Sequence, residues 1–492
     1  MYTFSSKLKT LSFVLMAVGI LGIGYGFLTA PKDIQDVEKL LAAESHGSHG
    51  EAKHETSGVS DETHVATADH TEVTEGEKMV EGTAAGSPSV DSSKVVEQIQ
   101  AEPVHAEVIV KKEGHHELSA EEEHTEHLNH VLHQLQNKPW SAFYVACIFF
   151  MLVSLGVLVF YAIQQVAQAG WSPVLFRVMQ GITAYLPVGS VIFFIFLLLS
   201  GFHLNHLFIW LDPEVVATDK LIANKAGYLN FPFWIIRAAI FLIGWNLYRY
   251  YSRKNCLAQD EANDNLNYKK NFKLSAMFLV FFIVSESIMS WDWIMSIDPH
   301  WFSTLFGWYV FASFFVSSIT TIALVTLYLK AKGVLEHVNT SHIHDLAKFM
   351  FGFSIFWTYL WFSQYMLIWY ANIPEEVTYY ITRIELYNLP FFGAVVMNFV
   401  FPLLILINTD FKRITWVLVM AGVVILGGHY IDFFNMIMPG TVGDRWFIGI
   451  SEIASVLFFL GLFIYVVFTA MTKVPLLAKR NPFIEESKHF HY

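Results

Sequence analysis

Two acidic residues, Glu286 and Asp292, stand within a strongly apolar stretch that runs from Ser285 to Trp308. A carboxylate in hydrocarbon costs roughly 2.5–3.5 kcal/mol even on insertion scales, so such groups usually face a protein interior or a water-filled path. The two acids are six residues apart and several tryptophans surround them. This composition suggests the handling of protons or of a quinol.

Other titratable residues fall in or beside apolar stretches, where a histidine or a buried carboxyl can accept a proton near neutral pH. We predict a proton path made of these residues: Glu286, Asp292, His203, His429, Asp432 and Glu452. We predict electrostatic or pocket-lining roles for a second set: Arg237, His206, Asp298, His300, Glu375 and Glu376.

Several of these residues also have a purely structural interpretation. Arg237 would neutralise Asp292 or Glu452 as a buried ion pair. His203 and His206, three residues apart, would be hydrogen-bonded packing residues on one helical face. The run 298–300, Asp-Pro-His, is typical of a tight turn, and Glu375 and Glu376 would cap a short surface helix.

The elements that must position these residues are membrane-spanning helices. The chain has 492 residues, of which 54% are hydrophobic and 15% charged, and its mean hydropathy is +0.43. Runs of about 18 or more apolar residues can cross a bilayer about 30 Å thick, and helices satisfy their own backbone groups there. We expect an all-α polytopic fold of about ten spans: 11–29, 140–163, 184–209, 231–251, 274–297, 304–329, 346–371, 391–408, 414–437 and 447–471.

The Lys/Arg bias of the short loops predicts the orientation. The loops after the fourth, sixth, eighth and tenth spans are rich in cations, and the alternate loops carry few. We therefore expect both termini on the cytoplasmic side of the membrane. Residues 1–29 have the composition of either a signal peptide or an anchor helix, and we favour a retained N-terminal anchor helix. We expect 473–492 to form a cytoplasmic tail.

Residues 30–138 have a different composition, with 23 Asp/Glu against 8 Lys/Arg, a balance of −15 compared with −12 for the whole chain. We expect a largely disordered periplasmic linker, because such a sequence buries too little apolar surface to fold alone. Its end, 118–136, has helical spacing and leads into Trp140. Its twelve histidines suggest adventitious metal affinity rather than a defined site.

The sequence contains few residues that could ligate a redox cofactor. The only cysteines, Cys147 and Cys256, are not in a C-x-x-C-H motif, and no phosphate-binding or dinucleotide fingerprint is present. An intrinsic b-type haem would need two axial histidines, such as His203 or His206 with His429, but paired mid-helix histidines are weakly represented. We expect no cofactor or metal bound by this chain alone.

Two long motifs carry a family resemblance: SESIMSWDWIMSIDPHWFSTLFGWYVF at 285–311 and WFSQYMLIWYANIPEE at 361–376. They resemble signatures of the membrane subunits of alternative complex III, a bacterial quinol:cytochrome c (or high-potential acceptor) oxidoreductase. The first helix and the acidic, His-rich insert resemble the subunit family called ActF. The resemblance implies two four-helix bundles of the NrfD-like (polysulfide-reductase membrane-subunit) fold in 139–472, flanked by extra helices.

The resemblance further implies partners: a paralogous NrfD-like membrane subunit, an iron–sulfur subunit, haem c subunits and membrane lipid, with menaquinol or ubiquinol nearby and no nucleic acid. In that family the paralogue is the better-supported quinol site, and this subunit is implicated in a proton path. We therefore expect a scaffolding and proton-conducting subunit of a respiratory complex. Alternatives are a catalytic quinol-binding subunit, a secondary transporter or a purely structural assembly subunit.

Overall fold

The chain folds into helices. The computed structural model describes residues 2–48 and 120–491, and within these ranges there is no β-strand, which confirms the expected all-α membrane fold. The long helices are α1 (Ser6–Thr29), α3 (Ala120–Val166), α5 (Leu186–Gly201), α8 (Phe231–Gln259), α9 (Leu266–Trp293), α10 (Phe306–Ala331), α11 (Thr340–Ala371), α15 (Thr415–Ile437) and α17 (Ile450–Met471). The shorter helices are α2 (Ile34–Ser48), α4 (Phe176–Ile182), α6 (Pro213–Thr218), α7 (Lys220–Lys225), α12 (Pro374–Glu385), α13 (Asn388–Val395), α14 (Phe401–Leu406), α16 (Pro439–Val442) and α18 (Ile484–Lys488).

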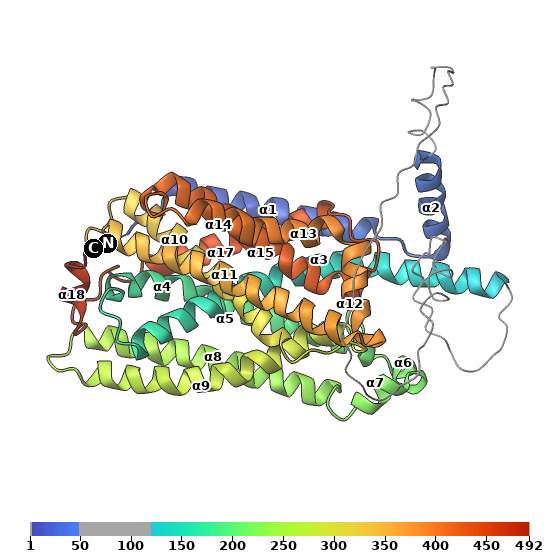
Figure 1. Cartoon of the computed structure of the whole chain (residues 1–492), viewed down its shortest axis with the longest axis horizontal. Coiled ribbons are helices and arrows are strands. Elements are labelled where there is room, and N and C mark those ends of the chain that lie inside the picture. Colours follow the sequence, from blue (N-terminus) through green and yellow to red (C-terminus); the bar gives the residue numbers. More distant parts are fainter. Residues whose placement is uncertain (1, 49–119, 492) are drawn as a thin grey trace, which may run out of the picture. The chain divides into compact units, whose positions relative to one another are not determined.

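Nine helical segments in the described ranges are long and apolar enough to cross a membrane. They match all the predicted spans except 346–371. That segment lies in α11, a helix of 32 residues that packs along α10 (Figure 1). Its many tryptophans and tyrosines lower its hydropathy, although such residues are common where a helix meets the membrane interface. The membrane crossing of 346–371, the seventh predicted span, therefore stays a prediction.

The third span ends earlier than its apolar composition suggests. We predicted a helix to residue 209, but α5 ends at Gly201. His203 follows in the left-handed conformation, with φ 57°, and the Leu204 N–H bonds the Leu199 carbonyl at 3.1 Å. This is the geometry of a helix C-terminal cap. The prediction that His203 and His206 share one helical face is therefore wrong.

Helix α3 lies between two groups of helices (Figure 1), which also touch each other where α9 packs on α10. Most of its membrane-length segment is buried. The Tyr144 hydroxyl donates to the Trp293 carbonyl of α9 at 2.7 Å, and the Ser318 hydroxyl of α10 donates to the Val153 carbonyl at 2.8 Å. We call α5, α8 and α9 with α3 the first group, and α10, α11, α13, α14 and α15 the second group. The two NrfD-like bundles of the resemblance stay a prediction.

Helices α1 and α17 pack against each other at very short range and in opposite directions. A Cβ at Gly22 would lie 2.5 Å from the Cβ of Ala454, and one at Gly461 would lie 2.7 Å from the Ser12 carbonyl oxygen. Small residues that let two helix backbones approach are typical of helix pairs in membranes. The predicted anchor helix is therefore an integral part of the helix assembly.

The linker prediction falls mostly on residues 49–119, which lie outside the described residues. Contacts divide the chain into one unit of residues 1–37 and 128–492 and a second of residues 38–127. The predicted helix at 118–136 and the second span, 140–163, are joined in α3, which continues through Pro139. The start of the predicted 139–472 domain therefore falls inside a helix.

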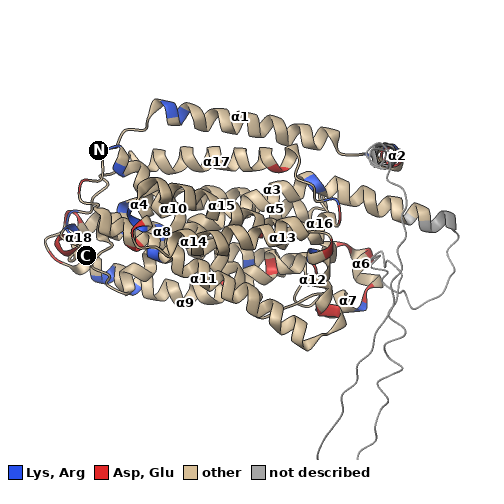
Figure 2. Cartoon of the chain, turned by 45° about the horizontal axis from the view of Figure 1, so that its top comes forward, with Lys and Arg blue, Asp and Glu red and all other residues tan. Residues whose placement is uncertain are grey.

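The two ends of the first unit differ in charge. Both termini lie at one end, which we call the termini end, and lysines and arginines gather there (Figure 2). Acidic residues of α6 and α12, together with Asp212 and Asp219 just before α6 and α7, lie at the opposite end. The C-terminal tail packs onto the termini end, where the Ser487 hydroxyl donates to the Trp171 carbonyl at 2.6 Å.

Candidate functional site: buried titratable groups

The second group of helices encloses a network of polar side chains, which we call the His429 network: His429 and Asp432 of α15, Tyr309 and Ser313 of α10, and Trp357 of α11. Asp432 is 1% exposed and accepts hydrogen bonds from the Tyr309 hydroxyl, from the Ser313 hydroxyl at 2.7 Å and from the Trp357 indole N–H at 2.8 Å. Nδ1 of His429 lies 3.0 Å from the Ser313 hydroxyl oxygen. The structure therefore brings His429 and Asp432 together, as the predicted proton path requires.

The direction of these hydrogen bonds follows from the number of available hydrogens. Ser313 has one hydroxyl hydrogen, and Asp432 accepts it. His429 therefore donates from Nδ1 to the Ser313 oxygen, and its Nε2 is left as an acceptor. Nε2 is buried and has no hydrogen-bond partner in the described part of the chain. A proton taken up at Nε2 can thus displace the Nδ1 proton to Ser313, which passes its own to Asp432.

The polar character continues from the network toward the termini end. On α10 the Ser317 hydroxyl donates to the Ser313 carbonyl at 2.9 Å, and the Thr321 hydroxyl donates to the Ser317 carbonyl at 2.8 Å. These residues are buried and recur every four positions, so they follow one face of α10 over about 12 Å. Buried polar groups that exceed their protein partners are the usual sites of internal water.

A π-helical turn at Val396–Val400 joins α13 to α14 beside the network. Pro402 lacks the N–H that would bond the carbonyl four residues earlier, which favours this local widening. Asn398 in the turn is fully buried, and neither end of its amide has a partner in the described part of the chain. A Cβ at Gly428 would lie 2.2 Å from the Asn398 Oδ1, so only glycine leaves room for this amide beside His429.

Glu286 is buried on α9, with 4% of its surface exposed. It accepts hydrogen bonds from Ser290 at 3.1 Å and, more weakly, from Ser287 at 3.4 Å. Among the described residues no lysine, arginine or histidine makes an ion pair with it. The neighbouring Ser287 packs against Gly307 where α9 crosses α10. Glu286 is thus a buried carboxyl held by hydroxyls alone, separate from the His429 network in its contacts.

Asp292 has the structural partner that the sequence allowed for. It is fully buried, and Arg237 of α8 binds it with two bonds, Nε to Oδ2 at 2.6 Å and Nη2 to Oδ1 at 2.9 Å. The guanidinium carbon lies 4.0 Å from the ring centre of Tyr228 and 4.2 Å from that of Phe233. Both the charge and the planar faces of Arg237 are satisfied, which leaves it little freedom to line a quinol pocket.

Glu452 lies in the first turn of α17 and is 2% exposed. Its Oε2 accepts the Gly449 backbone N–H at 2.8 Å, whereas Oε1 is buried without a partner in the described residues. A carboxylate in this position satisfies an N–H that has no partner within the helix and complements the helix dipole. Its first role is therefore to cap α17.

The two predicted histidines after the third span are at the surface. His203 and His206 are exposed, and the His206 ring lies 5.4 Å from that of His133. Burial and the nearby His133 lower the pKa of His206 below its ordinary value. The structure does not bring either residue to the buried carboxylates.

The 298–300 turn is confirmed, with the Trp301 N–H bonded to the Asp298 carbonyl at 3.3 Å. Nε2 of His300 forms a hydrogen bond with Oδ2 of Asp219 at 2.5 Å, and the Lys225 ammonium donates to the Pro299 carbonyl. Burial opposes ionisation of Asp219, but hydrogen bonds from His300 and from backbone N–H groups outweigh it and lower the pKa of Asp219. These residues fasten the loop before α8 to the loop before α10.

Glu375 and Glu376 lie in the first turn of α12, and Glu375 is exposed, as expected of residues that cap a surface helix. The same helix carries Arg383, which sequence reasoning missed. Arg383 is 5% exposed, stacks 3.3 Å from the Tyr379 ring centre and donates to the Asn435 carbonyl at 3.1 Å near the end of α15.

The other missed residues are Tyr309, Ser313, Trp357 and Asn398. Each belongs to a type that is common in membrane helices, and no spacing within a single helix marks it. The one available signal was the run of small hydroxyl residues through 313–326 of α10, which repeats at helical intervals.

The described residues offer no ligand set for a metal cluster. Cys147 and Cys256 are both buried, on α3 and α8, and no three His, Cys, Asp or Glu side chains of the described ranges gather as metal ligands. An iron–sulfur cluster needs several thiolates, so these residues do not fit one. We derive no electron-transfer step through this chain.

Comparison with known protein families and with characterised proteins gives no match for this chain. The fold and the site define a multi-pass helical membrane protein with titratable groups buried between its helices.

Proposed function

We propose that this chain conducts protons through its second group of helices, as an integral subunit of a respiratory membrane complex. The observation that carries the proposal is Asp432, a buried carboxyl that three neutral donors hold and that no lysine or arginine of the described residues pairs with. Such an acid can gain and lose a proton without leaving a buried cation unpaired.

The path we propose runs from Nε2 of His429 through Ser313 and Asp432 to the Tyr309 hydroxyl. His429 lies eight residues before the end of α15, about 12 Å, and Tyr309 three residues after the start of α10, about 5 Å. The network thus approaches the opposite end of the helices. The hydroxyl groups of α10 and the Asn398 amide would supply the inner part of the path.

The complex that best suits this role is a quinol:cytochrome c oxidoreductase of the alternative complex III type. The support is the pair of motifs at 285–311 and 361–376. Because no three His, Cys, Asp or Glu side chains of the described residues gather as metal ligands, partner subunits would carry the electrons in such a complex. Those partners would be a paralogous membrane subunit, an iron–sulfur subunit and haem c subunits. The cation-rich termini end would face the cytoplasm of the bacterial inner membrane.

The test compares two tyrosine variants in the intact complex reconstituted into vesicles. Tyr309→Phe removes the hydroxyl that ends the path, and Tyr144→Phe removes an equally buried hydroxyl that bonds only a backbone carbonyl. We expect Tyr309→Phe and Asp432→Asn to lower proton release at least tenfold, with Tyr144→Phe close to the wild type. Equal proton release in Tyr309→Phe, Asp432→Asn and wild type would refute the path.

Membership of the complex has its own test. The tagged chain, purified from its native membranes in mild detergent, should carry haem c absorbance and quinol:cytochrome c reductase activity. A chain that purifies alone and without haem would remove the respiratory part of the proposal and leave the proton path to be tested in vesicles.

A further inference from the structure

A cavity opens at the termini end between α8 and α17. Its volume is about 660 Å³, and it is lined by residues of three elements: Arg249, Tyr250, Arg253, Lys254 and Leu257 of α8, Tyr465, Val466, Thr469, Ala470 and Lys473 of α17 and the turn that follows it, and Ala184 of the turn before α5. The cavity is far from the His429 network along the chain's helices and takes no part in the proposed proton path.

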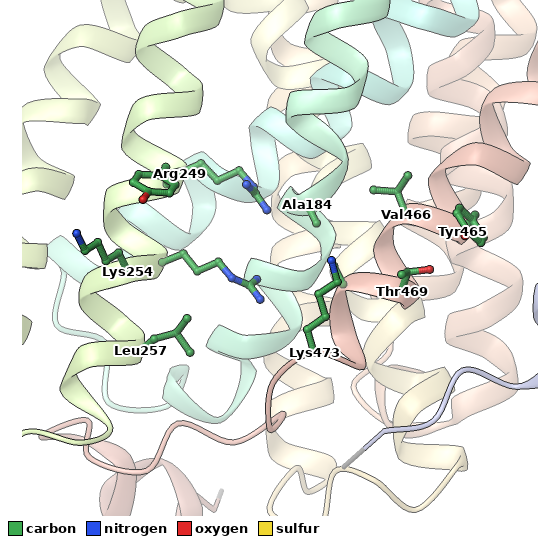
Figure 3. Close-up of a pocket in the computed structure, with 11 residues that line it drawn as sticks. Ala184, Arg249, Lys254, Leu257, Tyr465, Val466, Thr469 and Lys473 are labelled. Carbon is green, nitrogen blue, oxygen red and sulfur yellow. The ribbon is translucent and has the colours of Figure 1, made fainter.

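The charge of the lining has one sign. Four of the eleven lining residues are lysine or arginine, and none is acidic. Figure 3 shows the Arg249 side chain reaching from α8 toward Ala184 and Lys473 reaching toward the same space from the α17 side, whereas Lys254 points away from it. Cations that converge on a space without an acid favour an anionic occupant.

No acidic side chain of the described residues is found among the groups that line the cavity or bond these cations. Arg249 makes no hydrogen bond or ion pair within the described residues, and its buried Nε has no partner. Arg253 makes one long hydrogen bond, to the Gln180 carbonyl at 3.4 Å. The nearest acid on α8's end, Asp260, is engaged by Arg177 at 2.5 Å and by the Lys479 N–H at 2.9 Å.

The depth of the cations matches the headgroup region of a membrane. Arg249 lies 18 residues after the start of α8 at the opposite end, a distance of about 27 Å along the helix. The hydrocarbon core of a bilayer is about 30 Å thick. A guanidinium at that level meets phosphate groups, and basic pockets between spanning helices commonly bind acidic lipid headgroups.

The walls of the cavity favour a lipid over a free anion. Ala184, Leu257, Val466 and Ala470 give it apolar sides, and its volume is much larger than a phosphate ion needs. Tyr250 at its rim is 58% exposed, and Leu247 and Ile243, which follow on the same face of α8, are 50% and 58% exposed. This apolar stripe runs from the cations into the membrane, where acyl chains would lie.

We propose that this cavity binds an anionic phospholipid, whose phosphate pairs with Arg249, Arg253 and Lys473 and whose acyl chains lie along α8. The lipid joins the first group of helices to the α1–α17 pair across a space that side chains do not fill. A neutral quinone headgroup would leave the three cations uncompensated, so it does not suit the site.

The test measures retained lipid on the intact protein, purified in mild detergent with its native partners, by native mass spectrometry. Arg249→Gln with Arg253→Gln removes two cavity cations, and Lys269→Gln with Lys270→Gln removes two exposed cations at the same end outside the cavity. After exchange into micelles that contain phosphatidylglycerol and phosphatidylcholine in equal amounts, we expect wild type and the Lys269/Lys270 variant to retain phosphatidylglycerol. The Arg249/Arg253 variant should retain at least fivefold less.

A second variant keeps all the cations in case the first does not fold. Ala470→Trp fills the cavity, so this variant should also fail to retain phosphatidylglycerol. In a separate titration, inorganic phosphate should leave the thermal midpoint of every variant unchanged. Equal retention of phosphatidylglycerol and phosphatidylcholine would overturn the proposal. Stabilisation by inorganic phosphate equal to that by phosphatidylglycerol would also overturn it, because it would indicate a site for a free anion. A cross-linking experiment that joins a protein segment to 249–254 in place of lipid would overturn it as well.

Discussion

Replacing Asp292 by asparagine should destabilise the protein far more than replacing Glu286 by glutamine. Both acids are on α9, and both substitutions exchange a carboxyl for an amide of the same size. Asp292→Asn leaves Arg237 charged and buried without a counter-charge, and the amide oxygen can replace only one of the two carboxylate oxygens that accept its hydrogen bonds. Removing one member of a buried ion pair costs about 3–5 kcal/mol. The stacking of Arg237 on Tyr228 and Phe233 is present in the wild type as well, so it does not offset this loss.

Glu286→Gln leaves no ion unpaired, because hydroxyl groups are the only partners of Glu286 in the described chain. The amide oxygen still accepts from Ser290, so we expect a change below about 1 kcal/mol. Unfolding by sodium dodecyl sulfate in mixed micelles, followed by tryptophan fluorescence, measures both variants against wild type. The double variant Arg237→Gln with Asp292→Asn removes both charges and should be more stable than Asp292→Asn alone.

Two results would refute this reasoning about the pair. One is an Asp292→Asn midpoint equal to that of Glu286→Gln. The other is strict additivity of the Arg237 and Asp292 substitutions, because two groups in contact should show a coupling energy.

Three further predictions concern other parts of the structure. Gly22→Leu should destabilise the protein by about 1–3 kcal/mol, because the larger side chain separates α1 from α17. Gly24→Leu should be neutral, because a Cβ at that position meets nothing within 4 Å. Equal thermal midpoints of the two variants would contradict the close packing. Burial lowers the pKa of His342, which lies before the predicted span 346–371, from 6.5 to about 4, so the unfolded form binds a proton first as the pH falls. We therefore expect the docking of 484–491, whose Ser487 carbonyl contacts His342, to lose up to about 3 kcal/mol between pH 6.5 and 4. Hydrogen exchange of that segment measures the loss, and His342→Gln should abolish its pH dependence. Because the pKa of Asp219 is lowered in the folded protein, ionised Asp219 stabilises the fold above the ordinary aspartate pKa, and this stabilisation is lost as the pH falls through the folded value. Limited proteolysis of 212–230 should therefore accelerate in acid. The Asp219→Asn variant should be cut at the same rate at every pH.

The helices were predictable because a bilayer permits few alternatives to them, and the apolar runs marked nine of the spans that we expected. The end of α5 was not predictable from hydropathy, since residues 202–209 are still largely apolar and only the conformation of His203 stops the helix. Helix α11 was predicted as the span 346–371, but its aromatic residues lower its mean hydropathy, so its membrane crossing stays a prediction. The end of α5 depends on local geometry, which an average over a window of residues does not record.

The residues of the candidate site also fall into those that the sequence could identify and those that it could not. The sequence marked His429 and Asp432 because charged types are rare in membrane helices. It could not identify Tyr309 and Trp357, which come from other helices and become partners of Asp432 only when α10, α11 and α15 pack together. The ion pair of Arg237 with Asp292 was one of two alternatives, and the choice between Asp292 and Glu452 depended on which helix faces α8.

The four buried acids of the predicted proton path, Glu286, Asp292, Asp432 and Glu452, differ in how the protein compensates their charge. This difference bears on which of the four could carry protons. Protonation of Asp292 would leave Arg237 unpaired, and protonation of Glu452 would weaken the cap of α17. Asp432 and Glu286 accept from neutral groups, mostly hydroxyls, and a hydroxyl can reverse from donor to acceptor by rotating. Of these two, only Asp432 is connected through Ser313 to a second titratable group, His429. A carboxyl that can change its protonation state at little cost and has a proton donor within reach is the most suitable relay in this molecule.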